Sequence, residues 1–240
     1  MNLNKRLIPV LLLDQKGLYK TTKFKKAKYV GDPINALKIF NEQGVDEIAI
    51  LNFKKKSIDK DLLNYLSQIA SEAFIPLSFG GGVRSVSEIS QLFKIGFEKV
   101  IINSEIFNEQ MISEAIQKFG SQSIVASIDI KKTIFKGYQH IVQGKNYELD
   151  STIEYINHTG FGEVLVQDVS REGTMTGPDL SLISKLEKKF NSPMVFSGGF
   201  GNVSEIKTVL NNFNISAVAV GSLCVYFGKE KGVLINYPKL

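Results

Sequence analysis

Short apolar segments recur along the chain, and stretches with helical spacing separate them. Most are continuous apolar runs, which is typical of parallel strands covered on both faces. They are Leu7–Leu13, Glu47–Asn52, Pro76–Phe79, Lys99–Ile102, Ser123–Ile128, Glu163–Val166, Pro193–Phe196 and Ala217–Val220. The pattern predicts parallel β-strands that alternate with helices.

The segments between the strands carry helix-boundary signals. Asp32 and Pro33 supply an N-cap and a proline at the first helical position, and glycines follow the last apolar positions of two other segments. The clearest helical segments are Pro33–Gln43, Val86–Ile95, Asn108–Phe119 and Leu180–Phe190. Eight strand–helix alternations in 240 residues predict an α/β fold, a single (β/α)8 TIM barrel over residues 1–240. An open doubly wound sheet is the alternative.

Two segments 117 residues apart are near copies of each other. Residues 76–89 read PLSFGGGVRSVSEI, and residues 193–206 read PMVFSGGFGNVSEI. A repeat at half the chain length favours a barrel of two halves, about 1–120 and 121–240, and an open sheet does not explain it. Residues 134–149 alternate in polarity and contain two glycines, which predicts a β-hairpin inserted after the fifth strand.

Composition and charge narrow the class of protein. No apolar run approaches the ~20 residues of a membrane span. The first run ends at Asp14, so we interpret it as a strand and not as a signal peptide. The lone Cys224 excludes an internal disulfide and gives no metal spacing, which fits a reducing cytoplasm. His140 and His158 lack a placed partner and are interpreted as surface residues.

The net charge of +5 comes partly from two lysine clusters, at positions 23–28 and 54–56. We interpret both as solvated loops, with attraction of a phosphorylated ligand as the alternative. No nucleic-acid-binding motif accompanies them, so nucleic acid is not an expected partner.

Candidate chemistry follows from the rule that barrel enzymes place their site at the carboxyl ends of the strands. Glycines at 80–82 and at 198–199 offer backbone N–H groups to a phosphate, and Ser104 and Ser222 follow the next strand in each half. Tight turns alone are the alternative explanation. Asp129 ends the fifth strand and is the acid/base candidate, with loop capping as its other possible role.

A second group of charges stands at the opposite, amino-terminal ends of the strands. Arg6, Glu47, Lys99 and Glu163 begin the first, second, fourth and sixth strands. Two cations and two anions at these places could form a salt-bridged ring around the bottom of the barrel. Charged residues on this face usually serve stability, so spacing alone indicates structural ion pairing.

Several motifs together resemble the HisF family, the cyclase subunit of imidazole glycerol phosphate synthase. They are KRLIPVLLL (5–13), GDP (31–33), FGGGVRS (79–85), FGSQS (119–123), SIDIKK (127–132) and SREGT (170–174). The resemblance covers essentially the whole chain. It implies a barrel that binds a bis-phosphorylated ribonucleotide at its carboxyl-terminal face. It also implies a HisH-like glutaminase at the amino-terminal face, whose ammonia passes through the barrel core.

The resemblance gives roles to individual residues. It implies that Arg6, Glu47, Lys99 and Glu163 form a charged gate for ammonia and that Asp129 is one of two catalytic aspartates. It implies no cofactor and no metal. The positions that match phosphate- or substrate-binding residues are Lys20, Gly81, Gly82, Asn103, Ser104, Gly173, Thr174, Gly198, Gly199, Gly221 and Ser222.

The chain departs from the family pattern at the other catalytic aspartate. Aligned without a gap, Leu12 takes its place; a slide of two residues would put Asp14 there instead. We favour the gap-free alignment because the slide needs two extra residues inside a barrel strand. Two further positions depart from the family pattern. Asn52 stands where the family has an acidic residue at the end of the second strand, and Glu172 stands where it has an aspartate.

The departures resemble a HisF-like branch that is found with surface-sugar biosynthesis, as do VGDPINALKIFN (30–41) and KGVLINYP (231–238). In that branch the barrel is thought to pass ammonia from a HisH-like glutaminase to a separate N-sugar amidotransferase, which makes an acetamidino sugar. Two alternatives remain. One is a genuine cyclase of histidine biosynthesis that uses Asp129 with Asp14, and the other is a non-catalytic scaffold that activates the glutaminase.

Overall fold

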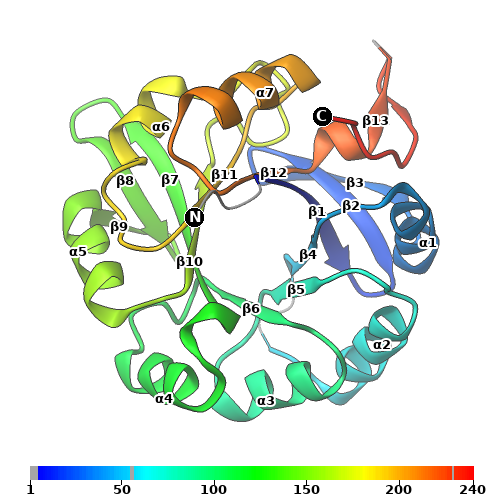
Figure 1. Ribbon diagram of the computed structural model, residues 1–240, viewed down its shortest axis with the longest axis horizontal. Helices are drawn as coiled ribbons and strands as arrows, with labels where there is room; N and C mark the ends of the chain where they lie inside the picture. Colours follow the sequence, from blue (N-terminus) through cyan, green and yellow to red (C-terminus); the bar gives the residue numbers. More distant parts are fainter. Residues whose placement is uncertain (1–4, 55–56, 229) are drawn as a thin grey trace.

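The computed structural model describes residues 5–54, 57–228 and 230–240. Eight parallel strands close into a barrel, and helices cover its outside (Figure 1). The predicted (β/α)8 barrel is confirmed. Around the barrel the strands follow the order β1 (Arg6–Asp14), β4 (Ile48–Asn52), β5 (Leu77–Gly80), β6 (Lys99–Ile102), β7 (Ile124–Thr133), β10 (Glu163–Asp168), β11 (Met194–Ser197) and β12 (Ala217–Val220).

Each of the seven α-helices among the described residues begins at a side chain that accepts a hydrogen bond from an N–H group of the first turn. In the repeated segments these caps are Ser85 and Asn202, so the shared Val-Ser-Glu-Ile letters are the first turns of two equivalent helices. The helices are α1 (Pro33–Gln43), α2 (Lys60–Ser71), α3 (Val86–Lys94), α4 (Glu109–Phe119), α5 (Leu149–Thr159), α6 (Leu180–Leu186) and α7 (Val203–Asn212).

The expected eighth helix is missing from the described part of the chain, so the prediction of eight strand–helix alternations was wrong at its last step. A 3-10 turn at Ser222–Cys224 follows β12, and then come a short hairpin of β13 (Tyr226–Phe227) and β14 (Gly232–Val233) and an extended tail. The tail is anchored at the bottom of the barrel, where the Tyr237 hydroxyl donates to the carbonyl of Leu7 at 3.2 Å. This segment takes the place of a helix between α7 and α1 (Figure 1).

Two antiparallel hairpins extend the barrel at its carboxyl-terminal end. β2 (Gly17–Thr22) and β3 (Lys25–Gly31) follow β1, and β8 (Gly137–Val142) and β9 (Lys145–Glu148) follow β7. The first hairpin was not expected, and placing the lysines at 23–28 in a loop was wrong, because three of them lie in β3. In the other lysine cluster, Lys55 and Lys56 fall outside the described residues. Since β1 and β7 are four strands apart in both directions, the hairpins lie on opposite sides of the barrel (Figure 1).

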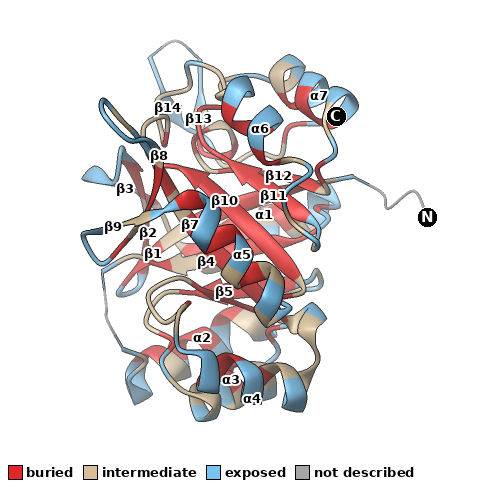
Figure 2. Cartoon of the chain, turned by 90° about the vertical axis from the view of Figure 1, so that its left-hand side faces the viewer, coloured by how far each residue is buried: buried red, intermediate tan, exposed pale blue. Residues whose placement is uncertain are grey.

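Apolar side chains form two layers. The larger one lies between the strands and the helices, and Figure 2 shows the barrel strands as the most buried part of the molecule. The smaller one fills the inside of the barrel and consists of Ile8, Val10, Ala49, Ile101, Val125, Leu165, Val195, Ala217 and Ala219. None of the described helices is both long and apolar enough to cross a membrane. The smaller apolar layer thus lies inside the barrel, between its two ends.

Candidate functional site

A pocket opens at the carboxyl-terminal end of the barrel. Polar groups line it from several strand ends and from the loop after β10. Seven of the predicted site residues come together here: Lys20, Asp129, Gly173, Gly198, Gly199, Gly221 and Ser222. The pocket lining does not include Asp14, Gly81, Gly82, Asn103, Ser104 or Thr174.

Asp129 is the pocket residue with the most altered acidity. Burial raises its pKa to about 7, and a hydrogen bond from Asn103 works in the opposite direction. Asn103 is held in place because its amide group also donates to the carbonyl of Ser127 at 3.2 Å. A carboxyl with this pKa can take up and release a proton near neutrality, which is the requirement for general acid–base chemistry.

The pairing of β1 with β4 places Leu12, and not Asp14, in the pocket. Leu12 lies opposite Leu51, just as Asp129 lies opposite Gln167 in the other half, and no bulge interrupts the pairing from Val10 to Leu13. Both Leu12 and Leu51 line the pocket. The structure therefore follows the gap-free alignment, and an apolar side chain stands where the resemblance places a second carboxylate.

Asp14 lies past the pocket, at the end of β1. Its buried carboxylate pairs with the Nζ atom of Lys54 at 2.6 Å. It also closes the tight connection to β2, where it is paired with Gly17. These contacts give Asp14 a structural position and keep it apart from Asp129.

Ser222 supplies the strongest indication of a ligand in this pocket. Its side chain is buried, and its Oγ atom has no hydrogen-bond partner among the described residues. A buried hydroxyl without a partner costs free energy, so such groups usually mark a missing ligand or water. Gly198, Gly199 and Gly221 also line this pocket, and a hydroxyl together with unhindered backbone N–H groups suits a phosphate.

Backbone packing alone explains why Gly81 in the first repeat and Gly198 in the second are glycines. A Cβ atom on Gly81 would lie 2.0 Å from the carbonyl oxygen of Asn52, and one on Gly198 would lie 2.8 Å from that of Asp168. Both residues also have positive φ angles, 97° and 120°. Glycine is required at both places whatever the loops bind, so it carries less functional information than Ser222.

The equivalent cradle in the first half is arranged differently. Gly81, Gly82 and Ser104 lie outside the pocket lining, and the carbonyl of Ser104 accepts a hydrogen bond from Gln143 in the β8–β9 turn at 3.3 Å. In the second half Thr174 also lies outside the lining, and its hydroxyl donates to the carbonyl of Arg171 in its own loop at 2.8 Å. Only the cradle of the second half opens into the pocket.

Glu172 fastens the β2–β3 hairpin over the pocket. Its carboxylate forms a buried ion pair with Lys20 and accepts hydrogen bonds from the Thr21 hydroxyl at 3.1 Å and the Phe24 N–H at 3.0 Å. Its backbone carbonyl accepts a further bond from Lys23. Phe24 is thereby held in the wall of the pocket. The side chain and the backbone carbonyl of one residue, Glu172, thus hold the turn of this hairpin against the loop after β10.

Replacing Glu172 with glutamine should loosen the β2–β3 hairpin without unfolding the barrel. The charge-assisted bond to Phe24 and the ion pair to Lys20 are lost, which should weaken local closure by about 1.5 kcal/mol. Amide hydrogen exchange in β2 and β3 should then accelerate roughly tenfold. The β8–β9 hairpin is the internal control and should keep its protection. Equal acceleration in both hairpins would contradict a local role.

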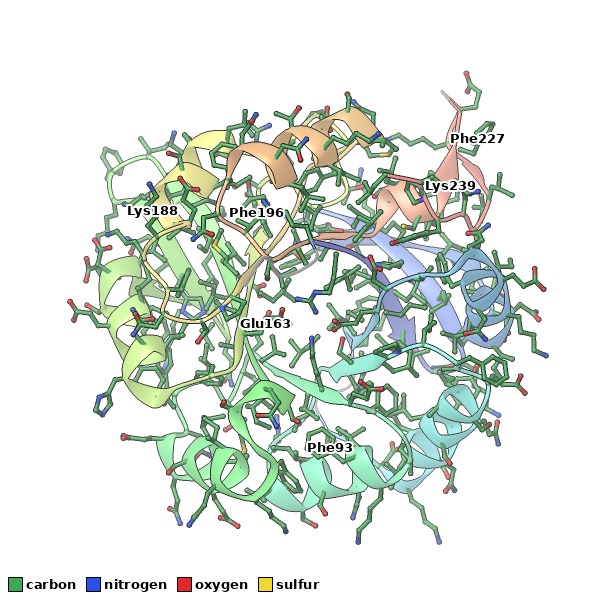
Figure 3. The ribbon with its side chains drawn as sticks, in the orientation of Figure 1. Phe93, Glu163, Lys188, Phe196, Phe227 and Lys239 are labelled. Atoms are coloured by element: carbon green, nitrogen blue, oxygen red, sulfur yellow. The ribbon has the colours of Figure 1, made fainter. Side chains whose placement is uncertain are left out.

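At the opposite end, four charged side chains form a closed ring. Arg6 pairs with Glu47 at 2.6 Å and also with Glu163, while Lys99 pairs with Glu47 at 2.9 Å and with Glu163 at 3.0 Å. The two carboxylates are buried, and Figure 3 shows Glu163 close to the barrel axis. The structure thus brings together all four residues of the predicted ring.

A small cavity lies directly above the ring. Glu47, Glu163 and Ser78 contribute to its lining, and the remainder is apolar. Leu165 and Ala219 line both this cavity and the pocket at the other end. The barrel interior is therefore polar at the ring, apolar in the middle and polar again around Asp129.

His140 differs from its predicted position, and interpreting it as a surface residue was wrong. It is fully buried in β8 against Phe107, with a ring-centroid distance of 5.9 Å, and its Nδ1 atom lies 3.3 Å from the Thr152 hydroxyl. Burial lowers its pKa to about 4. This histidine is a neutral packing residue that joins the hairpin to α5. His158 is exposed in the last turn of α5, as expected.

The fold and the two ends of its interior define a (β/α)8-barrel protein with a pocket around the Asp129 carboxyl on one face and a charged ring on the other. Residues 6–231 match the family of histidine biosynthesis proteins. The chain belongs to this family and, within it, is a HisF-like protein.

Individual relatives agree with this assignment. Over 98% of its length the chain is 40% identical to a Vibrio vulnificus (strain YJ016) protein, provisionally named imidazole glycerol phosphate synthase subunit hisF3, of which 94% is covered. It is 38% identical to a Pseudomonas aeruginosa protein provisionally named subunit hisF2 of the same synthase, and 37% identical to a Leptospira borgpetersenii protein provisionally named subunit HisF. In both cases 98% of this chain and 96% of the relative are covered.

Proposed function

We propose that this barrel is the ammonia-conducting subunit of a glutamine amidotransferase complex. It receives ammonia at the charged ring from a HisH-like glutaminase and releases it at the carboxyl-terminal pocket. There an N-sugar amidotransferase uses the ammonia to make an acetamidino sugar for a surface polysaccharide. The carrying observation is the combination of a complete ring at one end with Leu12 in the pocket at the other.

The interior between the two ends suits a small neutral molecule. Its lining is apolar and includes Ala49 and Ala219, so it offers little to ammonium but does not exclude ammonia. The ring supplies the polar entrance, since carboxylates can accept hydrogen bonds from an incoming nitrogen. The pocket at the other end supplies polar groups for its release.

Leu12 argues against cyclase chemistry as the main activity. A positioned acid or base contributes roughly 10² to 10⁴ in rate, so a cyclase with a leucine in place of one of its two carboxyl groups would be severely impaired. A conduit loses nothing by the same replacement. The names of two relatives, hisF2 and hisF3, are those of numbered variants, which fits a branch with a separate task.

A genuine cyclase of histidine biosynthesis is the second candidate. The observations in its favour are the carboxyl of Asp129, with a pKa of about 7, and the unpartnered hydroxyl of Ser222 in the same pocket. These would suit proton transfer on a phosphorylated substrate. A scaffold that activates the glutaminase without carrying ammonia is a third possibility, supported by the ring only as a docking surface.

Replacing Lys99 with methionine tests the conduit. The variant removes one cation from the ring and keeps the length of the side chain, so glutamine-driven amidation in the reconstituted complex should fall by about tenfold, the rate cost of roughly 1.4 kcal/mol. Amidation driven by free ammonium should not change. The matched control is Lys189→Met, which breaks an exposed ion pair with Asp150 and should leave both rates unchanged. Undisturbed transfer from glutamine with normal glutaminase activation would mean that the barrel is only a scaffold.

A complementation test separates the conduit from the cyclase. The chain is expressed in a bacterial strain that lacks its own cyclase subunit, on medium without histidine. We expect no growth, because the pocket lacks the second carboxylate. Growth at the rate given by an authentic cyclase subunit would refute the conduit as the main function.

A further inference from the structure

The tip of the hairpin between β7 and β8 exposes two large apolar side chains. Ile134 is 94% exposed and Phe135 is 96% exposed, although the chain has a core in which to bury such residues. The turn is closed by polar contacts of its own, because the Thr133 hydroxyl accepts from the N–H of Lys136 and donates to the carbonyl of Gly137. Neither apolar side chain is therefore needed to shape the turn. Exposed apolar groups of this size indicate a contact surface.

The two hairpins carry a large excess of positive charge. Residues 17–31 and 131–148, the latter reaching to the end of β9, contain nine lysines and one acidic residue, Glu148, whose side chain caps α5. Lys20 is buried in its pair with Glu172, whereas the other eight are exposed and form no ion pair within the described part of the chain. They are Lys23, Lys25, Lys26, Lys28, Lys131, Lys132, Lys136 and Lys145. A surface of this kind attracts an acidic partner.

These features lie at the same end of the barrel as the pocket. The hairpins stand on opposite sides of the barrel, and in the side view they project at the end away from the N-terminus (Figure 2). Phe24, at the turn of the first hairpin, both lines the pocket and is 48% exposed. The exposed apolar residues and the lysines thus lie on two sides of the barrel end at which the pocket opens.

We propose that the two hairpins dock an acidic face of the protein that accepts the ammonia, with Ile134 and Phe135 inserted into an apolar cleft beside that protein's active site. This proposal rests on the conduit function. A protein that seals the mouth keeps ammonia out of water and receives it directly. A membrane surface would satisfy the lysines and the apolar tip but would not receive ammonia. A second copy of this chain would bring like charges together.

The test measures binding of the purified barrel to the purified N-sugar amidotransferase of the same organism, by analytical ultracentrifugation. The variant I134S/F135S removes the apolar tip and should weaken binding at least tenfold. The matched control is Phe74→Ser, because Phe74 is 88% exposed but lies in the connection from α2 to β5. It should bind like the unchanged protein. Raising the salt concentration from 50 to 300 mM should weaken binding of the unchanged protein and of Phe74→Ser. The lysines lie at the surface, where salt screens their attraction to an acidic partner over about 10 Å at 0.1 M.

The outcomes test the docking surface and the conduit function independently of each other. No binding of the unchanged barrel, or equal binding of I134S/F135S, overturns the docking surface. Binding that depends on the tip, without any glutamine-driven transfer, supports docking and refutes the conduit. A third arm uses vesicles of phosphatidylcholine with phosphatidylserine. Tip-dependent binding to these vesicles without binding to the protein would assign the surface to lipid and overturn the proposal.

Discussion

Replacing Glu163 with alanine should lower the free energy of unfolding by about 3 to 5 kcal/mol. Glu163 accepts from both Arg6 and Lys99, so its loss leaves two cations at the bottom of the barrel with Glu47 as their one remaining partner in the ring. Removing one member of a buried ion pair is costly because the partner's charge remains desolvated. Urea unfolding at neutral pH, followed by circular dichroism, measures the change.

Asp150 provides the control for this experiment. It pairs with Lys189 at 2.5 Å, but both side chains are exposed, so Asp150→Ala should cost less than about 1 kcal/mol. The double variant Glu163→Gln with Lys99→Met keeps the charge balanced and should recover part of the lost stability. If Glu163→Ala and Asp150→Ala cost the same, the ring does not stabilise the barrel.

Replacing Asp129 with asparagine should stabilise the protein at pH 8 and leave it nearly unchanged at pH 4. The carboxyl has an ordinary pKa of 3.8 in the unfolded chain and a pKa of about 7 in the folded one. Between these values the folded state binds more protons than the unfolded state, so the stability falls as the pH rises. The full shift corresponds to about 4 kcal/mol, and partial exposure to the pocket reduces this to about 2 to 4 kcal/mol.

The measurement is a series of urea unfolding curves between pH 4 and pH 8. The difference between Asp129→Asn and the unchanged protein should grow through this range and then level off above pH 7. Asp14→Asn is the matched control at the equivalent end of β1, where the carboxylate is paired with Lys54. It should lower the stability by up to about 1 kcal/mol and never raise it. A difference independent of pH would show that Asp129 titrates normally.

The barrel strands were predictable because each is buried on both sides and is therefore a continuous apolar run. The predicted and observed strands agree closely at Lys99–Ile102 and Ala217–Val220 and differ by a residue or two elsewhere, except that β7 continues to Thr133. Its last residues pair with β8 outside the barrel, where alternating polarity replaces the apolar run. The described residues after β12 form no α-helix, and the apolar residues there stand in two short runs, 223–227 and 233–235, with glycines at 228 and 232 between them.

The β2–β3 hairpin could not be recognised from its turn. Lys23 and Phe24 both have positive φ angles, 54° and 58°, in a place where glycine or asparagine usually marks a hairpin. Glu172 holds this turn through contacts that are distant in sequence. His140 was misjudged for a similar reason, because the aromatic residues that bury it come from other elements. Long-range contacts override local preference at both places.

For the candidate site, the rule that sites lie at the carboxyl ends of the strands located the pocket. It did not tell which of the residues at those ends line the pocket. The repeat by itself favoured Asp14, because residues 13–16 resemble residues 128–131, whereas the gap-free family alignment placed Leu12 at the strand end. The pairing of β1 with β4 and the presence of Leu12 in the pocket lining agree with the gap-free alignment. The sequence did not predict that the glycine loop of the second half lines the pocket while that of the first half does not. This difference depends on Gln143 from the second hairpin, which contacts the Ser104 carbonyl in the first half of the chain.

The ring also makes the two halves of the chain unequal partners in assembly. The half up to about residue 120 contributes Arg6, Glu47 and Lys99, whereas the other half contributes Glu163 alone. Two copies of the first half would therefore gather four cations around two carboxylates, and two copies of the second would bring two carboxylates without these cations. The charges of the ring balance only when one first half pairs with one second half. Although both halves repeat the alternation of strand and helix up to their last strand, this charge arrangement favours the mixed pair over either symmetric one.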